Sequence, residues 1–190
     1  MEASMPELTL FAGCNGAGKS TLIEHFGETF DNLINPDVFA RSLNPENPRK
    51  ADLSAGKLAL KAIRECLDKE VNFAVETTLS SDFYLKRMRE AKAKSYRVYF
   101  YYIGLQDVQM HIDRVRTRVI EGGHHIDSPD ILRRYDASLK NLKEALSLSD
   151  YGVVMDNSDR MLKTLLVMEN GVVTEQSLYR PYWLDQALQR

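Results

Sequence analysis

The sequence predicts an α/β fold in which a mostly parallel sheet is covered by helices on both faces. Short apolar runs of strand length alternate with longer stretches of helical spacing, and this alternation is typical of parallel strands joined by helical crossovers. The first apolar run also leads through a glycine-rich loop into a helical stretch. At 190 residues, 44% of them hydrophobic, the chain is long enough for one domain. We expect a single domain over residues 1–190, with its core at about residues 8–170.

The N-terminal half contains strands and helices in alternation. The expected strands are apolar runs at residues 8–12, 33–35 and 72–76. The expected helices lie at residues 21–26, 54–69 and 81–94, the last of them strongly charged and expected at the surface. On the second helix, the residues expected to face the core are Leu58, Ala62, Ile63 and Cys66. Residues 44–48 contain two prolines and two asparagines and are expected to form a loop.

The C-terminal half continues the pattern. An aromatic strand is expected at residues 96–103, and final strands at 151–155 and 165–168, with a hairpin turn at Asn170-Gly171. The helix after the aromatic strand has its apolar face at Val108, Ile112, Val115 and Val119. A longer helix is expected to begin near Ser128-Pro129, because serine is a good N-cap and proline fits a first turn.

Residues 13–21 read Gly-Cys-Asn-Gly-Ala-Gly-Lys-Ser-Thr, the G-x-x-x-x-G-K-S pattern of a phosphate-binding loop. Its glycines let successive backbone N–H groups point at a polyphosphate, and the helix that follows aims its positive end at the same group. Lys19 would supply a charge for the β- and γ-phosphates, and Ser20 a hydroxyl for Mg²⁺. The residues expected to bind the nucleotide are Gly13, Asn15, Gly16, Ala17, Gly18, Lys19, Ser20 and Thr21.

The order of strand, loop and helix argues against the alternative, a glycine-rich turn that matches by chance. The sequence therefore predicts a P-loop NTPase-type three-layer sandwich that binds a nucleoside triphosphate with magnesium.

Two acidic residues are expected beside the bound triphosphate, because ligands of open α/β sheets bind at the carboxyl ends of the strands. The second expected strand leads into Asp37, and the third ends at Glu76. A phosphotransferase needs a carboxylate to accept the proton of the attacking hydroxyl or to hold the metal. We interpret Asp37 as the base, while Glu76 would hold metal, orient the acceptor or replace Asp37. The structural alternatives are that Asp37 caps a short helix through Arg41 and that Glu76 is only a strand-end acid.

A second cluster of functional candidates is basic. Arg114 and Arg118 are four residues apart and share a helix face, while Arg116 points elsewhere. Such arginines could close over the γ-phosphate as part of a helical lid, with Gly122-Gly123 as a mobile joint. The alternative is a solvated basic face. His124-His125 lacks the partner spacing of a zinc site.

The composition excludes several classes of protein. A net charge of −2 gives no reason to expect nucleic acid or an anionic membrane as a partner. The apolar runs are too short to span a bilayer, and the first residues do not form a secretory signal. Cys14 and Cys66 are the two cysteines and suggest neither a disulfide framework nor a metal site, so we expect a cytoplasmic protein.

Taken together, residues 13–21, 35–39, 76–78 and the segment Gly122-Gly123-His124 resemble the zeta toxin family of P-loop kinases, and the resemblance runs from about residue 8 to 148. Members of that family look like ATP-dependent kinases, and the best known phosphorylates a sugar hydroxyl of UDP-N-acetylglucosamine. The resemblance implies ATP and Mg²⁺ as cofactors, a small-molecule hydroxyl acceptor (UDP-N-acetylglucosamine or a related compound), and an antitoxin protein as a possible partner.

The resemblance also assigns roles to single residues. Asp37 matches the catalytic base, and Lys19 and Ser20 match the phosphate and magnesium groups. Glu76 and Thr78 match residues that contact the sugar nucleotide.

The lid arginines match only in part. Arg114 matches one of two phosphate-neutralising arginines. The second falls near His124 or His125, so that Arg118 or Arg134 would substitute for it.

The acceptor side departs from the family pattern. A substrate-binding acid of the family falls near Leu60, and an arginine falls at Ser80. The family's Asp-x-Phe-Arg segment reads Asp37-Val38-Phe39-Ala40 here, with Arg41 one place late. The phosphoryl-transfer groups are therefore largely kept, while the acceptor pocket is not.

Two other classes of function stay open. One is a non-catalytic or partner-coupled nucleotide-binding ATPase, against which the chain has no run of four apolar residues ending in Asp and no signature loop of a dimeric ATPase. The other is a nucleic-acid or RNA-end kinase, which the slight negative charge disfavours.

Overall fold

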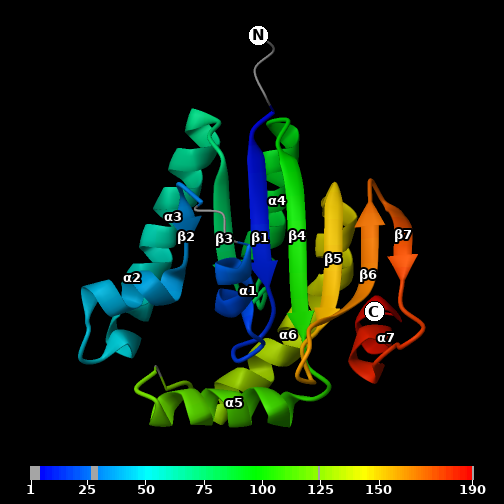
Figure 1. Ribbon diagram of the computed structural model, residues 1–190. Helices are drawn as coiled ribbons and strands as arrows, with labels where there is room; N and C mark the ends of the chain where they lie inside the picture. Colours follow the sequence, from blue (N-terminus) through cyan, green and yellow to red (C-terminus); the bar gives the residue numbers. More distant parts are fainter. Residues whose placement is uncertain (1–4, 27–29, 124, 190) are drawn as a thin grey trace.

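The structure is a computed structural model that describes residues 5–26, 30–123 and 125–189. Within them, one sheet has the strand order β2-β3-β1-β4-β5-β6-β7 (Figure 1). Its strands are β1 (Glu7–Ala12), β2 (Leu33–Ile34), β3 (Phe73–Thr77), β4 (Arg97–Gly104), β5 (Tyr151–Asp156), β6 (Lys163–Glu169) and β7 (Val172–Gln176). The first five pair in parallel, and β6 and β7 add an antiparallel edge. The predicted mostly parallel α/β sheet is confirmed.

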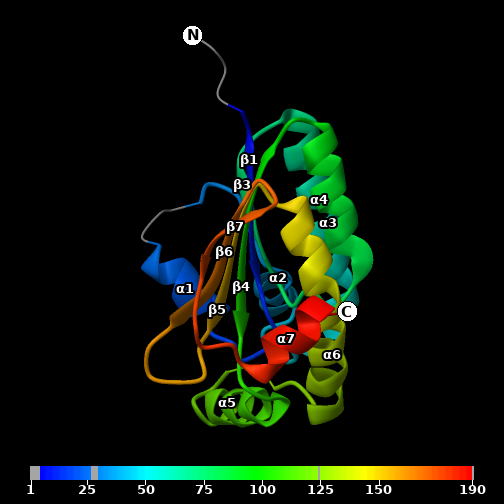
Figure 2. The ribbon, with the colours of Figure 1, turned by 90° about the vertical axis from the view of Figure 1, so that its right-hand side faces the viewer.

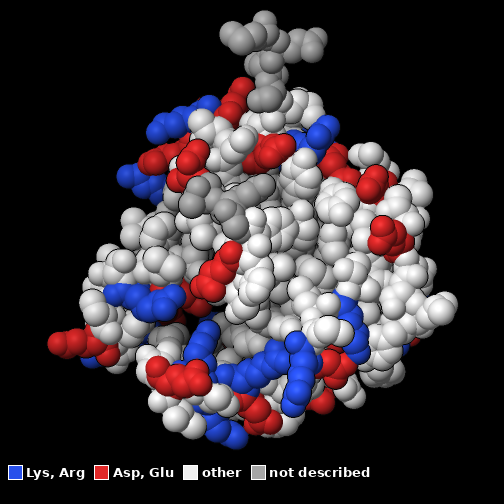
Figure 3. Space-filling model, viewed as in Figure 1, with Lys and Arg blue, Asp and Glu red and all other residues white. Residues whose placement is uncertain are grey.

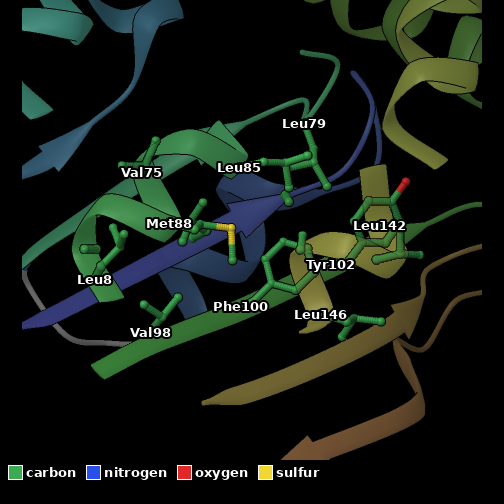
Figure 4. Packing of buried hydrophobic residues seen from close by; sticks show 14 of the residues in the cluster. Leu8, Val75, Leu79, Leu85, Met88, Val98, Phe100, Tyr102, Leu142 and Leu146 are labelled. Carbon is green, nitrogen blue, oxygen red and sulfur yellow. The ribbon is translucent and has the colours of Figure 1, made fainter. Parts of the chain in front are cut away.

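The central strands are buried on both faces, which explains why they read as continuous apolar runs rather than alternating ones. In β1, Leu10 lies between Val75 of β3 and Phe100 of β4, and each of the three side chains is at most 2% exposed. Figure 4 shows side chains of β1, β3, β4, α4 and α6 packed together in the main core cluster.

The helices are distributed unequally between the two faces. α1 (Lys19–His25) lies on one face, while α3 (Asp52–Lys69), α4 (Asp82–Ala93), α6 (Ser128–Leu148) and α7 (Tyr182–Gln189) lie on the other (Figure 2). α2 (Pro36–Leu43) and the 3-10 helix η1 (Pro48–Ala51) follow β2. α5 (Val108–Ile120) crosses below the carboxyl ends of the strands (Figure 1). The described helices include none that is both long enough and apolar enough to cross a membrane.

Several sequence-based expectations need correction. Leu58 is 41% exposed and is not a core residue, because the buried face of α3 is formed by Ala55, Ala59, Ile63, Cys66 and Leu67. Ser128 is the first residue of α6 rather than its N-cap, which is Asp127. The elements α7 and η1 had not been expected. The hairpin turn is confirmed, since Asn170 and Gly171 both have the positive φ that a two-residue hairpin requires.

Candidate active site

The phosphate loop connects β1 to α1 and has a backbone that glycine alone can adopt without strain. Gly13, Gly16 and Gly18 have φ values of 139°, 79° and 105°, in the region that other residues avoid. A Cβ atom on Gly13 would lie 2.2 Å from the carbonyl oxygen of Ile103, and one on Gly18 would lie 2.5 Å from Nδ2 of Asn157. The loop therefore passes tightly against the ends of β4 and β5.

Lys19, Ser20 and Glu76 meet at the start of α1. Phe11 of β1 is the register partner of Glu76, so β3 places this carboxylate beside the loop that leaves β1. Ser20 Oγ donates to the Glu76 carboxylate at 3.2 Å, and Lys19 Nζ lies 3.9 Å from Glu76 Oε1. Lys19 is only 7% exposed and also donates to the carbonyl of Cys14 at 3.3 Å. Asn35 Nδ2 donates to Glu76 Oε2 at 2.8 Å.

The donor set of Ser20 and Glu76 fits Mg²⁺, which prefers hydroxyl and carboxylate oxygens and takes most of its other ligands from phosphate and water. The part of the chain that the structure describes has no cluster of three or more His, Cys, Asp or Glu residues suited to a metal.

Asp37 does not cap α2. The N-cap is Asn35, whose Oδ1 accepts the backbone N–H of Asp37 at 2.9 Å, with Pro36 at the first helical position. The cap alternative for Asp37 is therefore wrong. Asp37 is exposed, and it lines two neighbouring cavities.

Two cavities meet along a common wall formed by Asn15, Lys19, Asn35, Asp37 and Glu76. The loop cavity, about 240 Å³, is completed by Gly16, Gly18, Ser20, Thr21, Arg41, Arg114 and Arg118. The strand-end cavity, about 260 Å³, is completed by Pro36, Thr77, Thr78, Ser80, Tyr84, Arg133 and Arg134. A third cavity of about 160 Å³ continues past Asp37 and is lined by Pro36, Asp37, Arg49, Asp52, Ala55, Ile126, Asp130 and Arg134.

The strand-end cavity is rich in hydroxyl groups. Thr78 Oγ1 and Ser80 Oγ lie 2.8 Å apart. Burial raises the pKa of Tyr84, so its phenol stays protonated and available for hydrogen bonds. Leu60 lines none of these cavities.

The structure divides the arginines between the two cavities. Arg114 and Arg118 line the loop cavity, whereas Arg134 lines the strand-end cavity and donates to Asn15 Oδ1 at 3.0 Å. Arg114 Nη2 donates to the carbonyl of Asn157 at 2.6 Å. In Figure 3, Lys and Arg side chains gather at the end of the molecule where α5 lies, with acidic side chains among them. The surface is therefore locally basic although the chain carries a net charge of −2.

Gly122-Gly123 ends α5 and forms a tight turn. Gly122 has a φ of 88°, and the N–H groups of Gly122 and Gly123 donate to the carbonyls of Val119 and Arg118 at 3.0 and 2.8 Å. This pair of bonds is a Schellman motif. In this structure the two glycines end the helix. The mobile joint stays a prediction, and His124 lies outside the described residues.

α5 and α6 pack directly on the phosphate loop. Cys14 lies in a buried cluster with Ile112, Val115, Ile126 and Ile131, and its Sγ donates to the carbonyl of Ile131 at 3.6 Å. Burial raises the pKa of the Cys14 thiol, so that it acts as a small apolar group here.

His111 is a residue of this contact that the sequence reasoning missed. It is 1% exposed, and its Nδ1 lies 2.8 Å from the carbonyl of Asn15, to which the neutral ring donates. Burial lowers the pKa of His111 to about 4, so the ring is neutral near pH 7. The sequence signal that could have identified His111 as buried was its place beside Ile112, on the apolar face of α5.

Asn157 was also missed, although it directly follows β5 at the same edge of the sheet. Its Nδ2 donates to the carbonyl of Ala17 at 2.8 Å. The strand-end rule that selected Asp37 and Glu76 would have found it.

The sequence of this chain is similar to a known family and to one curated protein. A family model described as Zeta toxin matches residues 1–164. A Haemophilus influenzae protein described as uncharacterized is 35% identical over 125 residues, which cover 66% of this chain and 89% of that protein.

Solved structures are similar in fold. A chain of the AvrRxo1-ORF1:AvrRxo1-ORF2 complex with ATP superposes with a TM-score of 0.73 at 16% identity, over 90% of this chain and 60% of its own length. This chain thus spans about 60% of the length of that relative. A structure of the PezAT chromosomal toxin–antitoxin system of Streptococcus pneumoniae has a TM-score of 0.59 at 18% identity, over 100% of this chain and 85% of that one. At these identities the likeness concerns the fold alone.

Proposed function

The chain belongs to the zeta toxin family, whose model matches residues 1–164, and from this premise we propose that it is an ATP-dependent kinase that phosphorylates a hydroxyl of a small molecule. The observation that carries the proposal is the wall shared by two cavities. Lys19, Asp37 and Glu76 all stand in that wall. A phosphoryl group transferred from one cavity to the other would pass close to the side chains of these three residues.

In this proposal the loop cavity holds the triphosphate. The backbone N–H groups of the loop and Lys19 bind the β- and γ-phosphates. Arg114 and Arg118 enter the same cavity from α5 and neutralise charge as it develops on the transferred group.

Ser20 and Glu76 would hold Mg²⁺, which would supply positive charge that offsets the charge of the phosphates. The contact of Glu76 with Ser20 at 3.2 Å supports this role for the carboxylate. Glu76 also lines the strand-end cavity, so an acceptor contact is compatible with the same position.

The strand-end cavity would hold the acceptor. Asp37 lines both cavities and is the carboxylate that we assign as general base, taking the proton of the attacking hydroxyl. Thr78, Ser80 and Tyr84 offer hydrogen bonds that orient a polar acceptor. We propose that the acceptor is a hydroxyl compound related to UDP-N-acetylglucosamine, with the acceptor contacts of the sugar nucleotide itself only partly kept.

The alternative function is a non-catalytic or partner-coupled ATPase. The polar strand-end cavity beside Asp37 favours the kinase, because an ATPase that drives a partner needs no second substrate pocket. The Streptococcus pneumoniae neighbour belongs to a toxin–antitoxin system, and this likeness supports an antitoxin protein as a partner of the present chain.

The test is ADP release from ATP and magnesium, measured alone and with a panel of sugar nucleotides, nucleosides and oligonucleotides. The proposal expects release that depends on a small-molecule acceptor and that falls by roughly a hundredfold or more in Lys19→Ala, because preorganised charge is lost. Turnover that is independent of every acceptor would support the ATPase alternative instead. Release that depends on oligonucleotides alone would indicate a nucleic-acid kinase.

A further inference from the structure

Residues 156–158 form a short segment that leaves β5 and lies between the phosphate loop and the C-terminal helix. Asn157 is its central residue. Its side-chain Nδ2 donates to the carbonyl of Ala17 in the phosphate loop at 2.8 Å. Its own backbone carbonyl accepts Nη2 of Arg114 at 2.6 Å. One residue thus bonds both to the loop and to an arginine of α5.

The fit of Asn157 against the loop is close. A Cβ atom on Gly18 would lie 2.5 Å from Nδ2 of Asn157, so the glycine is what lets the amide approach. The backbone N–H of Asn157 donates to the carbonyl of Gly104 at 3.0 Å, which fixes the segment to the end of β4.

The segment is also fixed by a buried hydrogen bond to α7. Asp156 is 1% exposed and accepts Trp183 Nε1 at 2.8 Å through Oδ2 and the backbone N–H of Ser158 at 2.9 Å through Oδ1. Trp183 of α7 is 2% exposed and packs against Gly104, where a Cβ atom would lie 2.4 Å from its ring. Buried, fully paired groups of this kind hold a backbone in one position.

We propose that Asn157 is a positioning residue that fixes the phosphate loop and Arg114 relative to each other. Arg114 lines the loop cavity, and its guanidinium carries five N–H donors. Engaging one of them with the Asn157 carbonyl orients the others before the nucleotide arrives, and such preorganisation strengthens charge stabilisation. α7 lies beyond residues 1–164, so this support reaches outside the matched family region.

The inference rests on the proposed function, since it assumes that Arg114 meets a nucleotide phosphate. It is tested by the affinity for a non-hydrolysable ATP analogue with magnesium, measured calorimetrically. The variants are Asn157→Ala, Arg114→Ala and the double variant. Ser158→Ala is the matched control, because its hydroxyl accepts the N–H of Gln106 and bonds to neither the loop nor Arg114. Asn157→Asp is the second variant in case Asn157→Ala does not fold, since it keeps the shape but loses the donor to Ala17.

We expect each single variant to bind the analogue about tenfold more weakly, with the double variant no weaker than the poorer single one. Asn157→Ala frees from the loop the segment whose carbonyl holds Arg114, and this change has no further effect once Arg114 itself is removed. Ser158→Ala should bind within about twofold of the original chain. A purely structural role of Asn157 would instead lower the thermal midpoint and leave the affinity of the folded variant unchanged, whereas independent roles of the two residues would give additive losses of about a hundredfold in the double variant. Unchanged affinity in Asn157→Ala or Asn157→Asp, or additive losses, would overturn the inference. An original chain that binds the analogue but phosphorylates nothing would contradict the kinase proposal alone.

Discussion

Among the single residues, Asn35 has two roles, one at the start of α2 and one beside Glu76. Its Oδ1 caps α2 by accepting the N–H of Asp37, and its Nδ2 donates to Glu76. The Asp37 carboxylate is therefore not needed to start the helix, and the Glu76 carboxylate is turned toward Ser20 and Lys19. The side-chain amide of Asn35 thus contacts both Glu76, which we assign to magnesium, and the backbone of Asp37, which we assign as the base.

Asp37→Asn should abolish most phosphoryl transfer and leave ATP affinity nearly unchanged. A general base acts on the attacking hydroxyl, so its loss appears in turnover, with an expected fall of about a hundredfold or more. Thermal stability should be unchanged, because Asn35 is the cap. Asp31→Asn, an exposed aspartate before β2, is the matched control. If Asp37→Asn keeps full turnover, Glu76 becomes the candidate base.

His111 predicts a pH dependence of stability. Burial lowers the pKa of His111 from its ordinary 6.5 to about 4. Between these values the unfolded chain binds a proton that the folded chain does not, so the free energy of unfolding falls as the pH falls from 7 toward 4. The expected loss from this group between pH 7 and pH 5 is about 2 kcal/mol.

The measurement is chemical denaturation at the two pH values, compared with His111→Asn, which keeps a donor near Asn15 but does not titrate. The other ionisable groups are common to both proteins, so they cancel in the difference. Equal pH dependence in the two proteins would show that His111 does not bury a neutral ring.

A site residue could be predicted from sequence when its partners lie close to it along the chain. The residue types and spacing of the phosphate loop predict a polyphosphate ligand, so Lys19 and Ser20 could be assigned from sequence. His111 and Asn157 meet the loop only through long-range packing, across 96 and 140 residues. Neither belongs to a local pattern that names its partner.

Among the elements, the end of α5 shows what a glycine pair does locally. Two adjacent glycines suggested a joint, and in the structure they satisfy the last carbonyls of α5 through a Schellman motif. α7 lacked a sequence prediction. It is eight residues long, and the burial of Trp183 that anchors it depends on strand ends far away in the sequence.

Gly122→Ala should destabilise the protein, and Gly56→Ala should stabilise it. Gly122 has a φ of 88° with no atom within 4 Å of an added Cβ, so only backbone strain of about 1 kcal/mol is introduced. Gly56 lies inside α3 with equally open space, and alanine there should add about 0.5–1 kcal/mol because it favours the helix. Urea denaturation measures both. Equal shifts of the same sign would contradict the Schellman assignment.

At the scale of the whole molecule, strand order is what assembles the site. β3 lies beside β1 in the sheet although β2 comes between them in the sequence. Alternating apolar runs could predict a parallel sheet, but they do not give the order of its strands, so the contact of Glu76 with Ser20 could not be derived from the pattern. The phosphate-loop pattern and the strand-end rule supplied Ser20 and Glu76 as candidate residues, and the register between β1 and β3 shows how they meet.

UDP-N-acetylglucosamine is expected to be a poor acceptor or none. The resemblance to the family implies that Ser80 stands in place of an arginine and Leu60 in place of an acid. In the structure, Leu60 lines none of the three cavities. A pocket that loses two charged contacts loses several kcal/mol of binding. Calorimetric titration of the sugar nucleotide against the complex with an ATP analogue measures this. Micromolar binding would show that other residues, such as Arg133 or Arg134, supply the contacts.

The most direct test of the kinase assignment follows the phosphoryl group itself. ATP labelled at its γ-phosphate is incubated with the protein, magnesium and a small-molecule extract of cells, and the products are separated. We expect the label to appear in a new small-molecule phosphate ester that Lys19→Ala and Asp37→Asn do not form. Label that appears only as inorganic phosphate, or in the same ester with Lys19→Ala, would show that the protein is not a kinase of this kind.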